Sequence, residues 1–168
     1  MKTICLIGYG TIGKPIFKYL RDLGYAVYAF DPTATAMKLT NCGISNDNIT
    51  KNEKLLENNL KAYDAVVVAT PHSVNLSVAR AAAKNNIPYF DLTEDVAVTG
   101  EIRTLADTSK TTMMPQCGLA PGAISVIATD LAKKFDELHS VKIRVGALPI
   151  ATENTMKYYL SWSLDGLI

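Results

Sequence analysis

The residues with the clearest chemical use stand near the start of the chain, where Gly8, Gly10 and Gly13 are followed by an acidic residue, Asp31. Gly8 can form a tight turn, Gly10 has no side chain to keep a ligand from the backbone, and Gly13 lets a helix pack closely. The N–H groups at the amino end of a helix carry a partial positive charge. This glycine spacing therefore predicts a turn that binds phosphate groups.

The flanking sequence supplies the elements that such a turn needs. The apolar run at residues 4–7 predicts a buried strand, and apolar residues at helical spacing over residues 12–23 predict a helix after the turn. Residues 25–30 predict a second strand, so Asp31 follows its end. Strand, glycine turn, helix, strand and carboxylate in this order form the dinucleotide-binding fingerprint. A glycine-rich turn in some other doubly wound protein is the alternative.

The acidic residue favours one cofactor over another. Asp31 would accept hydrogen bonds from both ribose hydroxyls and would repel a 2′-phosphate, and no arginine follows it closely. NAD is therefore expected rather than NADP, although Asp31 could instead be a solvated turn residue before Pro32. The residues predicted to contact the cofactor are Gly8, Tyr9, Gly10, Thr11, Ile12, Gly13, Asp31, Pro32, Ala69, Thr70, Pro71 and Leu92.

The rest of the chain alternates between strand and helix patterns. Strands are predicted at residues 65–69, 88–92 and 111–114, and helices at residues 53–60, 74–84, 96–105 and from 122 to about 135. A weaker helix is predicted near residues 33–39. This alternation predicts an α/β fold, a doubly wound parallel sheet of the Rossmann type over residues 1–122.

A different pattern begins near residue 139. Val141, Ile143 and Val145 alternate with charged residues, which predicts a strand with one exposed face in a different sheet. Residues 123–168 are therefore expected to hold a connecting helix and the start of a second α/β domain for substrate binding or dimerisation.

Polar residues follow the predicted strands at the edge where open α/β sheets bind ligands. His72 could act as a general acid or base near neutral pH, or it could simply lead into the next helix. Glu94 and Asp95 follow the next strand together with Asp91, and beside a cofactor they could move a proton or hold a substrate ammonium group. Capping of the following helix by Thr93 or Asp95 is the alternative. The predicted catalytic residues are His72, Glu94 and Asp95.

Three further residues could have either a functional or a purely structural role. The loop before a helix could activate the thiol of Cys117, or this residue could be inert packing. Arg144 could bind a substrate carboxylate through its two-pronged donor geometry, or it could be a surface charge. Trp162, with Tyr158 and Tyr159, could line a substrate pocket or belong to a core or interface. No spacing indicates a metal site.

Composition excludes several classes of protein. The 168 residues are 48% hydrophobic and 20% charged, as is usual for a globular domain. A net charge of +1 without blocks of like charge argues against nucleic acid or a membrane surface as a partner. No apolar run approaches the roughly 20 residues that span a bilayer, and no signal-peptide pattern opens the chain. With three scattered cysteines, a cytoplasmic location is expected.

Four sequence motifs carry a resemblance to a known family. The segments DLTED at residues 91–95, CGLAPG at 117–122, RVGALP at 144–149 and WSLDGLI at 162–168 resemble the saccharopine dehydrogenase and lysine dehydrogenase family. The resemblance implies a Rossmann domain, a second α/β domain and a substrate cleft. It also implies oxidation or formation of a carbon–nitrogen bond on an amino-acid substrate, by hydride exchange with a nicotinamide cofactor.

Members of this family are much longer than this chain, so it is expected to be a fragment of such an NAD-dependent enzyme. The alternative is a non-catalytic module that binds NAD and senses nucleotides. The expected partners are a small amino-acid substrate and, through the carboxyl-terminal segment, further copies of the chain.

Overall fold

A computed structural model of the chain describes residues 1–31, 53–146 and 155. Pro32, Trp162 and the helix predicted near residues 33–39 lie outside the described residues, as do Tyr158 and Tyr159. The chain divides into two compact units, Met1–Ala123 and Ile124–Ile168.

The first unit is built on a parallel sheet. Its strands are β1 (Thr3–Ile7), β2 (Ala26–Phe30), β3 (Ala65–Val68), β4 (Tyr89–Asp91) and β5 (Met113–Met114). They lie in the order β2-β1-β3-β4-β5, and each neighbouring pair is parallel. The predicted parallel α/β sheet is confirmed, although β5 is shorter than the strand predicted at residues 111–114.

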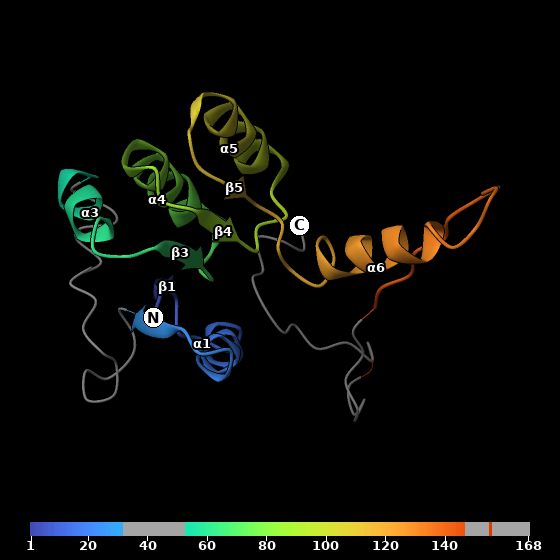
Figure 1. Cartoon of the computed structure of the whole chain (residues 1–168), viewed down its shortest axis with the longest axis horizontal. Helices are drawn as coiled ribbons and strands as arrows, with labels where there is room; N and C mark the ends of the chain where they lie inside the picture. Colours follow the sequence, from blue (N-terminus) through green and yellow to red (C-terminus); the bar gives the residue numbers. More distant parts are fainter. Residues whose placement is uncertain (32–52, 147–154, 156–168) are drawn as a thin grey trace. The chain divides into compact units, whose positions relative to one another are not determined.

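Helices cover both faces of this sheet. Helix α1 (Gly13–Asp22) lies on one face, whereas α3 (Glu53–Leu60), α4 (His72–Asn85) and α5 (Val96–Thr108) lie on the other (Figure 1). A parallel sheet covered in this way needs apolar residues on both sides of its strands, which explains the continuous run of valines in β3. The doubly wound arrangement expected from the sequence is therefore confirmed.

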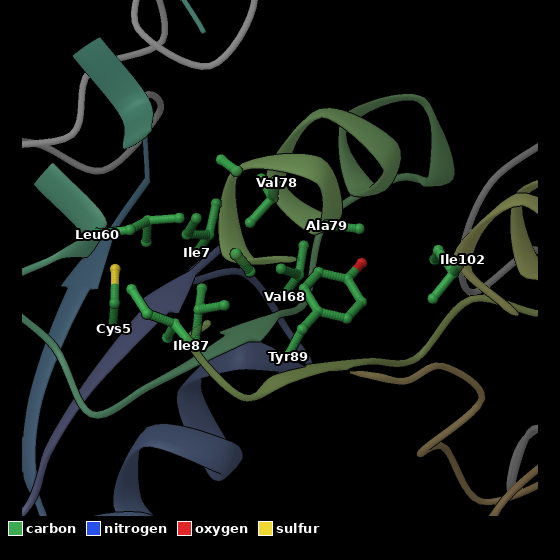
Figure 2. Packing of buried hydrophobic residues seen from close by; sticks show 12 residues of the cluster. Cys5, Ile7, Leu60, Val68, Val78, Ala79, Ile87, Tyr89 and Ile102 are labelled. Atoms are coloured by element: carbon green, nitrogen blue, oxygen red, sulfur yellow. The ribbon is translucent and has the colours of Figure 1, made fainter. Parts of the chain in front are cut away.

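Successive residues of the central strands pack into two separate cores. Cys5, Ile7, Val66 and Val68 belong to the larger cluster, where Leu60, Val78 and Ile102 reach in from the three helices (Figure 2). Leu6 points to the other face and packs in the smaller cluster with side chains of α1. Complete burial of an aliphatic side chain stabilises a fold by about 1.5–3 kcal/mol. The two cores therefore fix the sheet that carries the loops of the site.

The second unit departs from the sequence prediction. Helix α6 (Ala123–Ala132) begins at the boundary of the two units and ends before the predicted residue 135. Residues 141–146 form no strand, and Val141, Ile143 and Val145 are all exposed. The prediction of a strand here is wrong, because an alternation of apolar and charged side chains is not sufficient to form one. A strand also needs a neighbour for its backbone hydrogen bonds, and no described segment pairs with this one.

Candidate functional site

The order of the strands marks one point on the edge of the sheet. The chain runs from β1 to β2 on one side and then crosses to β3 on the other side of β1. Loops leave in opposite directions at such a point, and open α/β sheets bind ligands there, beyond the carboxyl ends of the strands. Ile7 pairs with Val68, so the loops that begin at Gly8 and Ala69 start side by side.

The glycine turn after β1 has the geometry that its sequence predicted. Gly8 has a φ of +97°, and a Cβ there would collide with the carbonyl oxygen of Ala69. A Cβ on Gly13 would collide with the carbonyl oxygen of Gly8, so Gly13 permits close packing against the turn itself. By contrast, nothing lies within 4 Å of a Cβ built on Gly10. The backbone at Gly10 is therefore open to a ligand.

The start of α1 leaves room for an anion beside this opening. Its N-cap residue, Ile12, makes no side-chain capping hydrogen bond, and the first turn of the helix contains no acidic residue. Thr11 and Ile12 are both exposed. An open glycine next to an uncapped helix start suits a pyrophosphate, because backbone N–H groups and the helix dipole both favour negative charge. The residues present are therefore compatible with a dinucleotide.

Asp31 lies against the same turn. Its Oδ2 accepts a hydrogen bond of 2.8 Å from the backbone N–H of Tyr9, and Asp31 is partly buried. The ring of Tyr9 packs edge-on against Phe17 of α1, with ring centroids 5.2 Å apart. The carboxylate is thus fixed beside the glycine turn, which argues against the alternative of a freely solvated turn residue.

The loop after β3 lies against the glycine turn at Gly8. Thr70 is partly buried, and its Cγ2 lies 3.0 Å from the position that a Cβ on Gly8 would occupy. Pro71 is the N-cap residue of α4, and His72 is the first residue of that helix and exposed. Thr70 is therefore next to the turn, whereas the position of His72 agrees with the alternative of a polar residue at a helix start.

A buried carboxylate, Asp91, joins the loops at the end of β4. Its Oδ2 accepts hydrogen bonds from the hydroxyl of Tyr89 at 2.5 Å and from Nδ2 of Asn75 at 3.1 Å. Its Oδ1 accepts from the backbone N–H groups of Thr93 at 2.9 Å and Gln116 at 3.3 Å. Burial and the charge of Asp91 raise the pKa of the Tyr89 hydroxyl, so this group stays protonated and donates.

The other two carboxylates of this segment have different surroundings. Asp95 is the N-cap of α5, and its Oδ1 accepts a hydrogen bond of 2.8 Å from the backbone N–H of Val98. The capping alternative is therefore confirmed for Asp95. Glu94 is exposed, and Leu92 is partly buried. The three carboxylates do not form one cluster, although they lie within five positions of the sequence.

Cys117 lies in the loop that Asp91 holds. Its backbone N–H donates to the carbonyl oxygen of Asp91 at 2.7 Å, and its thiol donates to the carbonyl oxygen of Met114 at 3.2 Å. Burial, and then the charge of Asp91, raise the pKa of the Cys117 thiol. A raised pKa leaves less reactive thiolate at neutral pH, so the structure favours inert packing over activation.

Sequence reasoning did not identify Asn75, Tyr89 and Gln116 as members of the site. Two signals were present. Asn75 shares a helix face with the buried residues Val78, Ala79 and Ala82, so its polar side chain had to find a partner. Tyr89 and Asp91 are two positions apart in one strand and therefore point to the same side.

Of the two substrate residues predicted from the sequence, Trp162 lies outside the described residues. Arg144 is exposed in the second unit. Among the residues that the structure describes, no group of three histidine, cysteine, aspartate or glutamate side chains could hold a metal ion. Within the same part of the chain, none of the helices has the length and apolar character needed to cross a membrane.

The sheet order, the glycine turn and the fixed acidic residue define a doubly wound dinucleotide-binding domain. Comparison with known families agrees. The family described as "Saccharopine dehydrogenase NADP binding domain" matches residues 4–114, which is more than half of the chain. The chain therefore belongs to this family of domains that bind a nicotinamide dinucleotide.

Relatives of this chain are distant and longer. The alpha-aminoadipic semialdehyde synthase of Mus musculus, named as mitochondrial, is 23% identical over 178 residues, which cover 99% of this chain and 19% of that protein. The protein of the same name from Rattus norvegicus is 24% identical over 178 residues, which again cover 99% of this chain and 19% of that protein. The chain thus spans about a fifth of the length of these curated relatives.

A solved structure shows the same fold. The apo saccharopine dehydrogenase (L-Glu forming) of Saccharomyces cerevisiae superimposes with a TM-score of 0.65 at 19% sequence identity. The match covers 99% of this chain and 40% of the yeast chain. At this identity the likeness supports the fold alone.

Proposed function

We propose that this chain binds NAD in preference to NADP and forms the cofactor-binding part of an oxidoreductase that acts on a carbon–nitrogen bond of an amino acid. The observation that carries the proposal is the carboxylate of Asp31, held at the glycine turn by the N–H of Tyr9. A carboxylate there accepts hydrogen bonds from ribose hydroxyls and repels a 2′-phosphate. The family description names NADP, and Asp31 is the reason for proposing NAD instead.

Each residue of the site has a proposed role that follows from its position at the edge of the sheet. The N–H groups around Gly10 bind the pyrophosphate, and Asp31 binds the adenosine ribose. A bound nicotinamide supplies the hydride acceptor or donor. His72, at the start of α4, and Glu94, in the loop after β4, are exposed at the same edge of the sheet and are proposed to hold or move a proton at the substrate nitrogen. Asp95 is proposed to take part in the same proton transfer, in addition to its capping hydrogen bond with the N–H of Val98.

The substrate is proposed to be an amino acid, with Arg144 binding a carboxylate and Trp162 contributing to the pocket. A cytoplasmic location is proposed from the sequence alone, and the two rodent relatives are named as mitochondrial.

Titration of NADH fluorescence with the chain tests cofactor binding. A matched pair of variants tests the site. Gly10→Ala adds a methyl group to the open backbone where the pyrophosphate would lie, so it is expected to weaken NADH binding by about tenfold or more. Gly100→Ala adds the same methyl group to another open glycine, in helix α5, and is expected to leave NADH binding unchanged.

The outcomes separate the parts of the proposal. Absence of NADH binding by the unmodified chain would contradict dinucleotide binding, and tighter binding of NADPH than of NADH would contradict the NAD preference. Addition of NAD with lysine or saccharopine, followed by absorbance of NADH, tests turnover. Binding without turnover supports the alternative of a nucleotide-sensing module.

A further inference from the structure

Asp91 is a buried charge that is held by hydrogen bonds alone. It has no exposed surface, and none of the ion pairs among the described residues includes it. Four donors surround its two oxygens, from β4, α4 and the loops after β4 and β5. Such an arrangement is costly to build unless every partner is correctly oriented.

The carboxylate fixes the orientation of Asn75. A carboxylate at neutral pH only accepts hydrogen bonds, so Asn75 must present its Nδ2 to Asp91, at 3.1 Å. The amide oxygen of Asn75 then faces away from Asp91 and lies 3.3 Å from Oγ1 of Thr70. An amide oxygen also only accepts, so Thr70 must donate its single hydroxyl proton to Asn75.

This chain of hydrogen bonds determines what Thr70 can offer to a ligand. Because the Thr70 hydroxyl donates its proton to Asn75, it can only accept a hydrogen bond on its other side. Thr70 lies in the loop after β3, beside Gly8 and at the reversal point of the sheet. With the adenosine ribose at Asp31, beyond β2, the other half of a bound dinucleotide lies on the β3 side of this point.

We propose that Asp91, acting through Asn75, sets the Thr70 hydroxyl as a hydrogen-bond acceptor for a donor group on the nicotinamide half of the bound dinucleotide. This inference rests on the proposed function. The donors available on that half are the ribose hydroxyls and the carboxamide N–H₂ group. Thr70 contacts the ligand, whereas Asp91 and Asn75 are positioning residues.

Dissociation constants for NAD and ADP test the contact at Thr70. ADP contains the adenosine ribose and the diphosphate but lacks the nicotinamide half. Thr70→Val keeps the shape of the side chain without its hydroxyl and is expected to weaken NAD binding about 5- to 10-fold, with ADP binding unchanged. Thr70→Ser keeps the hydroxyl and is expected to bind NAD within about twofold of the unmodified chain.

A second pair of variants tests the relay from the buried residues. Asp91→Asn presents an N–H₂ group to Asn75, which must turn its own amide and present N–H₂ to Thr70. Thr70 then accepts on its inner side, so the expected result is the same selective loss of NAD binding, about 5- to 10-fold. The exchange of both residues, Asp91→Asn with Asn75→Asp, places a carboxylate beside Thr70.

In that double variant Thr70 must donate inward again, and Tyr89 can donate to the carbonyl oxygen of residue 75, which lies 3.2 Å away. NAD binding is therefore expected to return to within about twofold of the unmodified chain. Asp64→Asn is the control. It changes another carboxylate that accepts two hydrogen bonds, at the opposite end of the strands, and should leave both ligands unaffected.

A purely structural role for Asp91 predicts a different result, in which NAD and ADP binding fall together and the exchange restores neither. That result would overturn the inference, as would an unchanged ratio of NAD to ADP affinity in Thr70→Val. Thermal unfolding of each variant shows whether it folds. If Asp91→Asn does not fold, the two Thr70 variants test the inference without it.

Two further readouts complete the experiment. An unmodified chain that binds neither NAD nor ADP refutes the proposed function, whereas binding of both with no effect of Thr70→Val refutes this inference alone. ADP-ribose, which has the second ribose but no nicotinamide, identifies the donor. Loss of ADP-ribose binding in Thr70→Val supports a ribose hydroxyl, and retained binding supports the carboxamide.

Discussion

Asp31 combines a structural contact with the charge that we propose selects the cofactor. Asp31→Asn keeps an oxygen that can accept from the N–H of Tyr9 but removes the negative charge. We expect the affinity for NADPH to rise relative to NADH by about tenfold, because a carboxylate no longer repels the 2′-phosphate. Fluorescence titration with both cofactors measures the ratio.

The expected salt dependence provides a check on this explanation. Repulsion between partly exposed charges is screened by salt, so the preference of the unmodified chain for NADH should narrow as the ionic strength rises. An Asp31→Asn variant with an unchanged NADPH to NADH ratio would show that another group selects the cofactor.

Some residues of the site could be predicted from the sequence and others could not. The roles of Gly8, Gly10 and Gly13 follow from backbone geometry within one short segment, which the sequence determines locally. The role of Asp91 depends on burial beneath α4 and the loop after β5, segments that are distant in sequence. Among the carboxylates of residues 91–95, only the folded structure distinguishes the buried one from the cap.

At the scale of a single element, Asp95 and Glu94 provide a matched comparison. Asp95→Ala removes the N-cap of α5 and is expected to lower the free energy of unfolding by about 1 kcal/mol. Glu94→Ala changes an exposed side chain and is expected to alter it by less than about 0.5 kcal/mol. Urea unfolding followed by circular dichroism measures both. Equal losses in the two variants would contradict the capping assignment.

Asp64 connects the starts of two strands and should make stability depend on pH. Its Oδ2 accepts from the backbone N–H of Thr3 at 2.6 Å and from the Thr3 hydroxyl at 2.9 Å. These hydrogen bonds lower the pKa of Asp64 below its usual value of 3.8. A carboxyl group with a lowered pKa in the folded state stabilises the fold above its unfolded pKa, and this stabilisation is lost as the pH falls through the folded pKa.

The expected result is a difference in stability between the unmodified chain and Asp64→Asn that is present at neutral pH and narrows below about pH 4. Unfolding curves of both proteins at neutral and acidic pH measure it. A difference that stays constant across this range would show that the Asp64 charge is not involved.

Elements with both faces buried were the easiest to predict. The continuous apolar run of β3 is typical of a strand that is covered on both faces, and the prediction there was correct. The alternation at residues 141–145 was ambiguous, because a strand forms only when another strand supplies its hydrogen bonds. The sequence contains the side-chain pattern but not the partner, so this prediction was wrong.

At the scale of the whole molecule, the two units differ in how well they bury their apolar residues. The first unit encloses two cores between its sheet and its helices. Helix α6 in the second unit has no buried residue, and Val126, Ile127 and Leu131 are each more than half exposed. The apolar surface continues after the helix with Phe135 and Leu138. Contiguous apolar surface of this kind promotes association in water.

We therefore expect the isolated chain to associate with itself as its concentration rises, measured by light scattering after size-exclusion chromatography. The double change Ile127→Glu and Leu131→Lys places opposite charges one helical turn apart, which is compatible with the helix but removes apolar surface. This variant should stay monomeric at concentrations where the unmodified chain associates. Val96→Lys changes a single apolar residue that is 85% exposed in the first unit and should not alter association. If the unmodified chain is monomeric throughout, or if Val96→Lys has the same effect as the double change, the α6 surface is not what drives association.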